Sequence, residues 1–332
     1  HVVVGTPGRV LKHLAKGSLD LSRLKSLVLD EADRMLDMGF HDSIAEVVSQ
    51  MPSQRQTLLF SATYSKEVRA MSTRFQRDPV SVTVADTPEA IKITQIFHEV
   101  DGRERVNAVA AILRHHKPET AVLFCNTKQR CDEVVTELAG KGFQVAALHG
   151  DLEQRDRDLV LVKFSNRSCP ILVATDVAAR GLDIKDLAMV INVEMAFDPE
   201  VHVHRIGRTG RAGQSGLAVS LCAPADGHRV LAVEDYQSIK VDWQDLPVAT
   251  GASSTVLPRM VTLNIAGGRK DKVRPGDILG ALTGDAGIPG AMVGKIDIFD
   301  MQAYVAVDRD VANQAIKGLG KIKGRIFRVR KV

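Results

Sequence analysis

The chain has 332 residues and a formal net charge of +4, and 25% of its residues are charged while 45% are hydrophobic. This composition is that of an ordinary globular protein, and the length favours two or three domains with separate cores. No apolar run is long enough to span a membrane and no signal peptide is recognisable, so we expect a cytoplasmic protein without a membrane partner.

The number and spacing of the cysteines are also typical of a cytoplasmic protein. The four cysteines form no CxxC pair and have no histidines at metal-site spacing: Cys125, Cys131, Cys169 and Cys222. This pattern indicates reduced thiols, mostly in the core of a cytosolic protein.

The first 86 residues alternate between apolar runs and helical patterns. We expect strands at His1–Gly5, Ser26–Asp30, Thr57–Ser61 and Val80–Val84, and helices at Asp42–Met51 and Lys66–Phe75. Alternation of this kind indicates βαβ units and a parallel sheet. Because a core strand stands first in the chain, we expect the front of this domain (residues 1–86) to be missing.

Two adjacent carboxylates follow one of these strands. The run Leu27–Leu29 stops at Asp30 and Glu31, at the carboxyl end of a buried parallel strand, where open α/β sheets bind ligands. Mg²⁺ binds through one or two carboxylates and fills its other positions with water and phosphate oxygens. Asp30 could hold such an ion and Glu31 could position or deprotonate a water. Alternatively, Asp30 caps a helix that begins near Ala32.

A short polar break at 86–90 precedes a second alternating series, which we interpret as a complete α/β domain over residues 92–245. Its strands are expected at Ile93–Val100, Ala121–Phe124, Val145–Leu148, Ile171–Thr175, Val190–Val193 and Leu217–Cys222. Its helices are expected at Arg103–His115, Lys128–Lys141 and Glu153–Phe164, with a further helix starting at Asp198-Pro199.

Three arginines within seven positions of this second domain are interleaved with glycine. His204 and Arg208 are spaced for one helical face, and Arg211 is expected beyond the helix end because Gly207 and Gly210 weaken the helix. Planar guanidinium groups suit phosphate recognition, although an exposed basic helix end explains the pattern equally well.

The chain changes character after a small polar linker at 246–257. Residues 258–332 carry 14 basic and 7 acidic residues, a net +7 that leaves −3 for the rest of the chain, which favours a polyanion partner. The pattern predicts the order β-α-β-β-α-β, with strands at Met260–Ile265, Gly294–Phe299, Ala303–Val307 and Ile326–Val332, and helices at Pro275–Leu282 and Val311–Gly318.

Six ordered motifs together resemble the DEAD-box RNA helicases over residues 1–245. They are Thr6–Arg9 (TPGR), Asp30–Asp33 (DEAD), Ser61–Thr63 (SAT), Gln154–Arg157 (QRDR), Ala179–Asp183 (ARGLD) and His204–Arg211 (HRIGRTGR). The resemblance implies an α/β protein with two RecA-like parallel-sheet domains, the first incomplete, that close on ATP and single-stranded RNA.

The resemblance also implies roles for individual residues. Asp30 would bind Mg²⁺ through water, and Glu31 would orient the hydrolytic water. Asp33, Ser61 and Thr63 would link the ATP site to the domain interface. Asp183 would contact the ATP ribose, and Gly181 would also belong to the nucleotide site. His204 would pair across that interface, with Arg208 and Arg211 as arginine fingers. The RNA backbone would be followed by Thr6, Gly8, Arg9, Gly150, Arg157, Thr175 and Asp176.

The sequence departs from the family in one element. No GxxxxGK[ST] motif occurs in the 332 residues, and this loop supplies backbone N–H groups and a lysine to the phosphates. We therefore expect the parent protein to hydrolyse ATP and the 332-residue chain to be largely inactive as an ATPase.

The carboxyl-terminal segment resembles the RRM-like RNA-binding domain of DbpA-type bacterial helicases, through residues 260–263, 274–284 and 321–325. That resemblance implies a small α+β domain that recognises a hairpin of 23S ribosomal RNA on the pre-large ribosomal subunit, with no obligate protein partner. An ordinary RRM stacks bases on two or three aromatics, whereas here Thr262 stands where one is usual. The expected contacts are Tyr304 and the basic residues Arg274, Lys321, Lys323, Arg325 and Arg328; alternatively, the basic run is a solvated edge strand.

Two other functions stay open at this point. The chain could be a non-catalytic RNA-binding fragment, or a general DEAD-box helicase with an unrelated carboxyl-terminal appendage.

Overall fold

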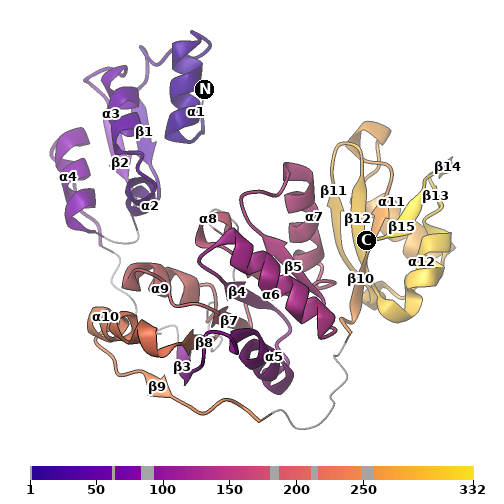
Figure 1. Cartoon of the computed structure of the whole chain (residues 1–332). Coiled ribbons are helices and arrows are strands. Elements are labelled where there is room, and N and C mark those ends of the chain that lie inside the picture. The colour runs from indigo at the N-terminus through magenta and orange to yellow at the C-terminus, as the bar shows by residue number, and fades with distance from the viewer. Residues whose placement is uncertain (1, 62–63, 84–92, 180–186, 211–215, 249–256) are drawn as a thin grey trace. The chain divides into compact units, whose positions relative to one another are not determined.

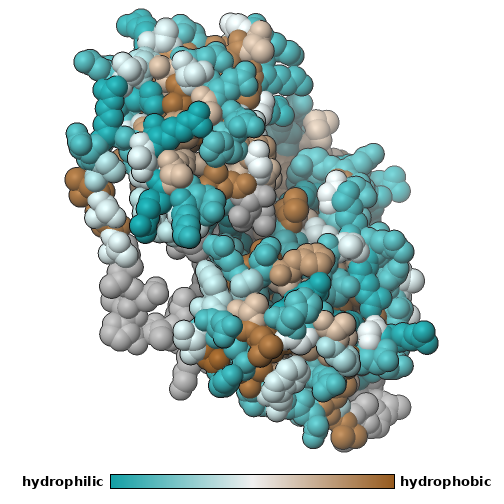
Figure 2. All heavy atoms as spheres, turned by 60° about the vertical axis from the view of Figure 1, so that its left-hand side comes forward, coloured by the Kyte–Doolittle hydropathy of each residue, from teal (hydrophilic) through white to brown (hydrophobic). Residues whose placement is uncertain are grey.

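The computed structural model describes residues 2–61, 64–83, 93–179, 187–210, 216–248 and 257–332. The chain divides into two compact units, His1–Ala85 and Asp86–Val332. Among the described residues no helix is long and apolar enough to cross a membrane. The four cysteines are free and buried, as expected from their spacing. Figure 2 shows a face on which hydrophilic side chains predominate and hydrophobic ones are scattered.

The first unit pairs two parallel strands, and helices pack around them. Its elements are α1 (Pro7–Ala15), β1 (Ser26–Leu29), α2 (Ala32–Asp37), α3 (His41–Ser49), β2 (Gln56–Leu59) and α4 (Lys66–Phe75). Leu29 and Ala32 pack with Ile44, Val68 and Met71 in its core. Strands β1 and β2 are parallel and pair along their whole length, so their carboxyl ends lie at the same edge of the sheet.

Two strand predictions in this unit are wrong. Residues Val2–Gly5 and Val80–Thr83 are described without strand pairing, and Val80 and Val82 are exposed. An apolar run becomes a strand only where a neighbouring strand pairs with its backbone. Neither of these two runs pairs with a strand among the described residues. The TPGR residues that follow the first of these runs form the start of α1, with Pro7 at its first position.

The second domain is built on a seven-stranded parallel sheet in the order β5-β6-β4-β7-β8-β3-β9. The strands are β3 (Ile93–Glu99), β4 (Ala121–Phe124), β5 (Val145–Leu148), β6 (Ile171–Ala174), β7 (Met189–Asn192), β8 (Gly216–Cys222) and β9 (Asp242–Trp243). The helices are α5 (Arg105–His116), α6 (Lys128–Gly140), α7 (Gln154–Ser165), α8 (Asp176–Ala179), α9 (Pro199–Ile206) and α10 (Gly227–Gln237).

Burial explains why this sheet was easy to predict. Every residue of β4, β6 and β7 is buried, as expected for a parallel sheet covered by helices on both faces. One expectation fails at α9, which ends at Ile206, so that Arg208 lies in the turn beyond the helix and not on its face.

The carboxyl-terminal module is a four-stranded antiparallel sheet in the order β11-β12-β10-β15, with helices packed on one face. Its elements are β10 (Met260–Ile265), α11 (Pro275–Gly280), β11 (Val293–Ile298), β12 (Ala303–Asp308), α12 (Ala312–Gly318), β13 (Lys321–Ile322), β14 (Arg325–Ile326) and β15 (Val329–Lys331). A π-helical turn over Ala281–Asp285 follows α11.

The last predicted strand, Ile326–Val332, is divided. A small hairpin of β13 and β14 comes first, and β15 then pairs with β10. Lys323 and Gly324 form the hairpin turn with φ of 50° and 76°, the left-handed pair that tight two-residue hairpins require. The basic run is therefore a hairpin and not a single edge strand.

Candidate nucleotide and RNA sites

The acidic pair of the first unit stands at the carboxyl end of β1. Glu31 adopts a left-handed backbone, with φ 53° and ψ 50°, which is costly for a residue other than glycine. Asp30 Oδ1 accepts the Glu31 N–H at 3.0 Å, and the Glu31 carboxylate pairs with Arg34 at 2.9 Å. Glu31, and not Asp30, occupies the cap position of α2.

The end of β2 lies beside this pair. Phe60 O accepts the Ala32 N–H at 3.0 Å, and Ser61 Oγ accepts the Asp33 N–H at 3.2 Å. The two strand ends therefore meet through the Ser61 hydroxyl and the backbone N–H of Asp33. Asp33 is buried in the first turn of α2.

The TPGR residues of the same unit start α1. Thr6 is the cap residue, and its carbonyl accepts the N–H groups of Arg9 and Val10. Its hydroxyl makes no capping bond, and Gly8 has open space where a side chain would be. Thr6, Gly8 and Arg9 are thus presented on the first turn of a helix, where backbone N–H groups favour anions.

In the second domain, polar residues gather past the carboxyl ends of the parallel strands. Gly150 follows β5, and Thr175 and Asp176 follow β6. Arg157, from the first turns of α7, donates from Nη2 to the Ala178 carbonyl at 2.8 Å, which ties α7 to α8. Gly150, Thr175 and Asp176 therefore share one edge of the sheet, as the RNA-binding prediction requires.

Arg205 holds together the residues at this edge of the sheet, although it was not among the site residues predicted from the sequence. The side chain is 2% exposed, and it donates to both Asp176 oxygens at 2.7 and 2.8 Å. It also donates to Asn126 Oδ1 and the Glu194 carbonyl, each at 2.8 Å, and lies over the Phe124 ring. The signal available in the sequence was weak: Arg205 shares the buried face of α9 (residues 199–206) with His202 and Ile206, and its spacing from His202 is that of one helical turn.

His202 lies on the same helix and is also buried. Its Nε2 lies 3.2 Å from Gln95 Oε1, and no hydrogen-bond partner of Nδ1 lies among the described residues. Burial, followed by the positive charge of Arg205, lowers the pKa of His202 to about 4. The ring is therefore neutral at physiological pH.

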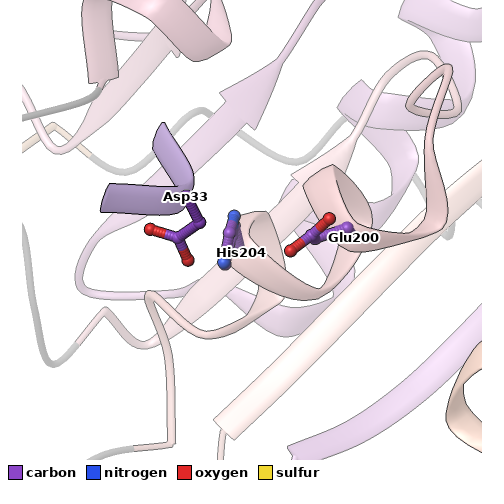
Figure 3. A group of neighbouring side chains, drawn as sticks. All are labelled: Asp33, Glu200 and His204. Atoms are coloured by element: carbon purple, nitrogen blue, oxygen red, sulfur yellow. The ribbon is translucent and has the colours of Figure 1, made fainter. Parts of the chain in front are cut away.

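Figure 3 shows Glu200 and His204 projecting from α9 one turn apart. Arg208 follows in the turn after the helix, where its carbonyl accepts the Leu187 N–H at 3.2 Å. The predicted pair His204 and Arg208 is thus divided between a helix and the turn beyond it. The remaining predicted residues of these motifs lie outside the described part of the chain: Thr63, Gly181, Asp183 and Arg211.

The basic residues of the module differ in how free their charges are. Lys323 pairs with Asp277 at 2.8 Å, and Arg325 Nη1 donates to the Asp271 carbonyl at 3.3 Å. The bond from Lys323 is the largest cause of the lowered pKa of Asp277. Lys321, Arg274 and Arg328 are exposed, whereas Tyr304 is buried against Phe299.

Three family models match successive parts of the chain. The DEAD/DEAH box helicase model matches residues 1–71, the helicase conserved C-terminal domain model matches 104–213, and the DbpA RNA binding domain model matches 262–331.

Known proteins agree with these matches. The ATP-dependent RNA helicase DbpA of Escherichia coli K12 is 52% identical over 332 residues, which cover 99% of this chain and 72% of that protein. DbpA of Bacillus subtilis 168 is 32% identical, with coverage of 100% and 74%. A structure of S. cerevisiae Dbp5 bound to RNA and ADP BeF3 aligns with a TM-score of 0.66 at 29% identity, over 74% of this chain and 66% of that one. The chain belongs to the DbpA-like DEAD-box RNA helicases.

Proposed function

We propose that this chain forms the greater part of an ATP-dependent RNA helicase that works on RNA anchored by its own carboxyl-terminal module. The observation that carries this proposal is the pair of parallel strand ends in the first unit, which present Asp30, Glu31 and Ser61 at one edge. Ligands of open α/β sheets bind at such an edge. The names of the two DbpA relatives support the same activity.

Each acidic residue has a distinct role in this proposal. Mg²⁺, when bound with ATP, neutralises phosphate charge. Asp30 fits such an ion through water, because one oxygen is held by the Glu31 N–H while the carboxylate stays exposed. Glu31 holds its carboxylate beyond the strand end through the left-handed backbone, and there it orients the hydrolytic water.

We further propose that Arg208 and Arg211 stabilise the charge that develops on the transferred phosphoryl group, and that Gly181 and Asp183 lie at the ribose. Thr6, Gly8, Arg9, Gly150, Arg157, Thr175 and Asp176 would follow the RNA backbone without reading its sequence. Because both Asp176 oxygens are held by Arg205, Asp176 acts on RNA chiefly by fixing the loop after β6.

For the module, we propose a 23S ribosomal RNA hairpin on the assembling large subunit as the partner. Support comes from the match of the DbpA RNA binding domain over 262–331 and from the net +7 of residues 258–332. Exposed Arg274, Lys321 and Arg328 suit phosphate contacts.

The test is a titration of the 332-residue chain with that hairpin and with a scrambled hairpin of equal length, at two salt concentrations. Tighter binding of the ribosomal hairpin at both salts is expected. Equal affinities would leave a general DEAD-box helicase with a non-specific basic appendage.

Hydrolysis requires a phosphate-binding loop that the 332 residues do not contain, so we propose that this polypeptide alone releases little phosphate from ATP. The measurement is phosphate release with ribosomal RNA present. It is compared with a chimera in which the loop-bearing segment of the Escherichia coli relative precedes residue 1. High turnover by the unfused chain would refute this part of the proposal.

A further inference from the structure

The outer face of the module's sheet is buried, although the module's own helices cover only the other face. Side chains alternate along β10 and β12, and Val261, Leu263 and Val305 point into the module's core. The residues between them are equally hidden: Thr262 is 0% exposed, Asn264 6%, Tyr304 5% and Ala306 1%. An antiparallel sheet with helices on one face leaves the other face to solvent unless something covers it.

The covering element is α7 of the second helicase domain, together with the residues after it. Asn166 Nδ2 donates to Thr262 Oγ1 at 3.1 Å, and Ser168 Oγ lies 2.6 Å from the same oxygen. Lys295 of β11 donates to Ser165 Oγ at 3.2 Å. Figure 1 shows α7 alongside β11 and β12.

The contact extends from the end of α7 toward its start. Charges on Arg155 and Asp158, which belong to the first turns of α7, act on the Tyr304 hydroxyl, whose pKa is raised chiefly by burial. Tyr304 thus has the helicase domain as its neighbour on the face where an ordinary RRM stacks a base.

We propose that the outer face of this sheet is a docking surface for α7, and that Thr262, Asn166 and Ser168 fix the orientation in which the module docks. The partner of the sheet is then the chain's own second helicase domain and not RNA. The Thr262 hydroxyl bonds to Asn166 and Ser168, so it favours one alignment of α7 on the sheet. Any sliding of α7 along the sheet would leave these buried polar atoms without hydrogen-bond partners.

The contact between α7 and the sheet face should separate more readily than a fully bonded interface. Asn166 Oδ1 is buried and accepts no hydrogen bond from the described residues, so the cluster is stabilised less than a fully bonded one. The buried neighbours Ala306 and Asn264 on the same face are small or polar, and such side chains tolerate solvent when the surfaces separate.

Docking would fix the orientation of the module, and of any RNA it binds, relative to the second helicase domain. Helix α7 has 12 residues, or about 18 Å. Arg157 lies near its start and Asn166 directly follows its end. RNA held by the module would therefore have a set direction relative to RNA at Arg157. This consequence rests on the proposed function, whereas the dock itself does not.

The test measures the distance between spin labels on the RNA-free 332-residue chain. Labels are attached to cysteines that replace exposed Glu137 of α6 and exposed Asn313 of α12. The four natural cysteines are buried and do not compete for the label. A single narrow distance distribution is expected. Thr262→Arg should convert it to a broad one, whereas Thr262→Ser, which keeps the hydroxyl, should leave it narrow.

Thr283→Arg is the matched control, because it adds the same side chain at an exposed position of the module and should leave the distribution narrow. Thr262 points away from the module's core, and circular dichroism verifies that each variant is folded. A broad distribution in the parent chain, or a narrow one in Thr262→Arg, would overturn the proposal.

A second arm adds the ribosomal hairpin. If the sheet face belongs to α7, the distribution stays narrow and Thr262→Arg binds the hairpin as tightly as Thr283→Arg. If the hairpin broadens the distribution and Thr262→Arg weakens its binding, the face is an RNA surface and the dock is refuted. Failure of the ribosomal proposal would appear differently, as equal binding of scrambled RNA by a chain that still docks.

Discussion

The parallel sheet of the second domain and the antiparallel sheet of the module place their polar residues in opposite ways. In the parallel sheet, strands such as β4 and β6 are wholly buried, and Thr175, Asp176 and Arg205 gather past the strand ends. In the module, Thr262 and Asn264 stand on a face of the sheet. A sheet that helices cover on both faces can expose polar residues only at its edge, past the strand ends. A sheet that helices cover on one face can use its other face to bind a partner. The predictions below test this division.

The largest effect is expected at the strand and helix ends. In the chimera that carries a phosphate-binding loop, Glu31→Gln should remove most hydrolysis, and Arg208→Ala should lower it by roughly 10³-fold or more, since a finger arginine is worth about that in phosphoryl transfer. Affinity for the hairpin should stay unchanged, because it arises in the module. The measurements are RNA-stimulated phosphate release and a hairpin titration, with Arg103→Ala at an exposed position as the surface control. An equal fall in turnover and affinity would contradict the division between edge and face.

Arg205→Ala should destabilise the second domain by about 3–5 kcal/mol, because it leaves the half-buried side chains of Asp176 and Asn126 without their buried donor. Arg205→Lys should recover little, since lysine cannot bond both Asp176 oxygens in one plane. The measurement is urea unfolding followed by fluorescence of Trp243, the single tryptophan, which packs on Phe97. The control is Arg130→Ala, whose ion pair with Glu133 is at the surface and should cost at most about 1 kcal/mol. Similar losses for the two variants would show that the edge network is not structural.

Acid should weaken the second domain through His202. Its pKa is about 4 when folded, whereas an unfolded histidine titrates near 6.5, so between these values the unfolded chain binds a proton that the folded chain does not. Stability is therefore full above about pH 6.5 and falls toward pH 4, by roughly 3 kcal/mol from this group. His202→Gln should flatten that part of the pH dependence in urea unfolding. An unchanged slope would exclude His202 as its source.

The smallest effects concern the module's cations. Arg328→Ala should weaken hairpin binding several-fold and lower the salt slope by about one, as loss of one phosphate contact does. Lys323→Ala should weaken it less, because Asp277 already neutralises that lysine. Asp277→Asn should in turn strengthen binding by releasing the charge. The salt-dependent titration compares all three, and a larger loss for Lys323→Ala than for Arg328→Ala would reverse this ranking.

Regular elements with strong periodicity were predictable from the sequence. The prediction for α4 has the observed bounds, and the six predicted strands of the second domain deviate by one residue at most at their ends. The short edge strand β9 was not predicted. The motifs also located the strand-end residues, since a buried run that stops at charged residues carries that information by itself. Where a run needed a distant neighbour to become a strand, as at Val80–Thr83, local pattern was insufficient.

What the sequence could not predict depends on contacts between distant residues. Arg205 looked like one more arginine of a basic motif, and only the fold brings Asp176, Asn126 and Glu194 around it. Thr262 was recognised as an unusual residue at an aromatic's position, but not as the partner of Asn166, which is 96 residues away. Lys323 likewise appeared as free charge until Asp277 was found beside it.

The left-handed backbone at Glu31 has a consequence for efforts to stabilise this chain. Glycine adopts this conformation without the steric penalty of about 1 kcal/mol or more that glutamate bears there. Glu31→Gly would relieve that strain, and it would also remove the carboxylate that we propose orients the hydrolytic water. A search for stabilising variants would therefore favour the wrong residue at this position unless RNA-stimulated ATP hydrolysis is assayed alongside.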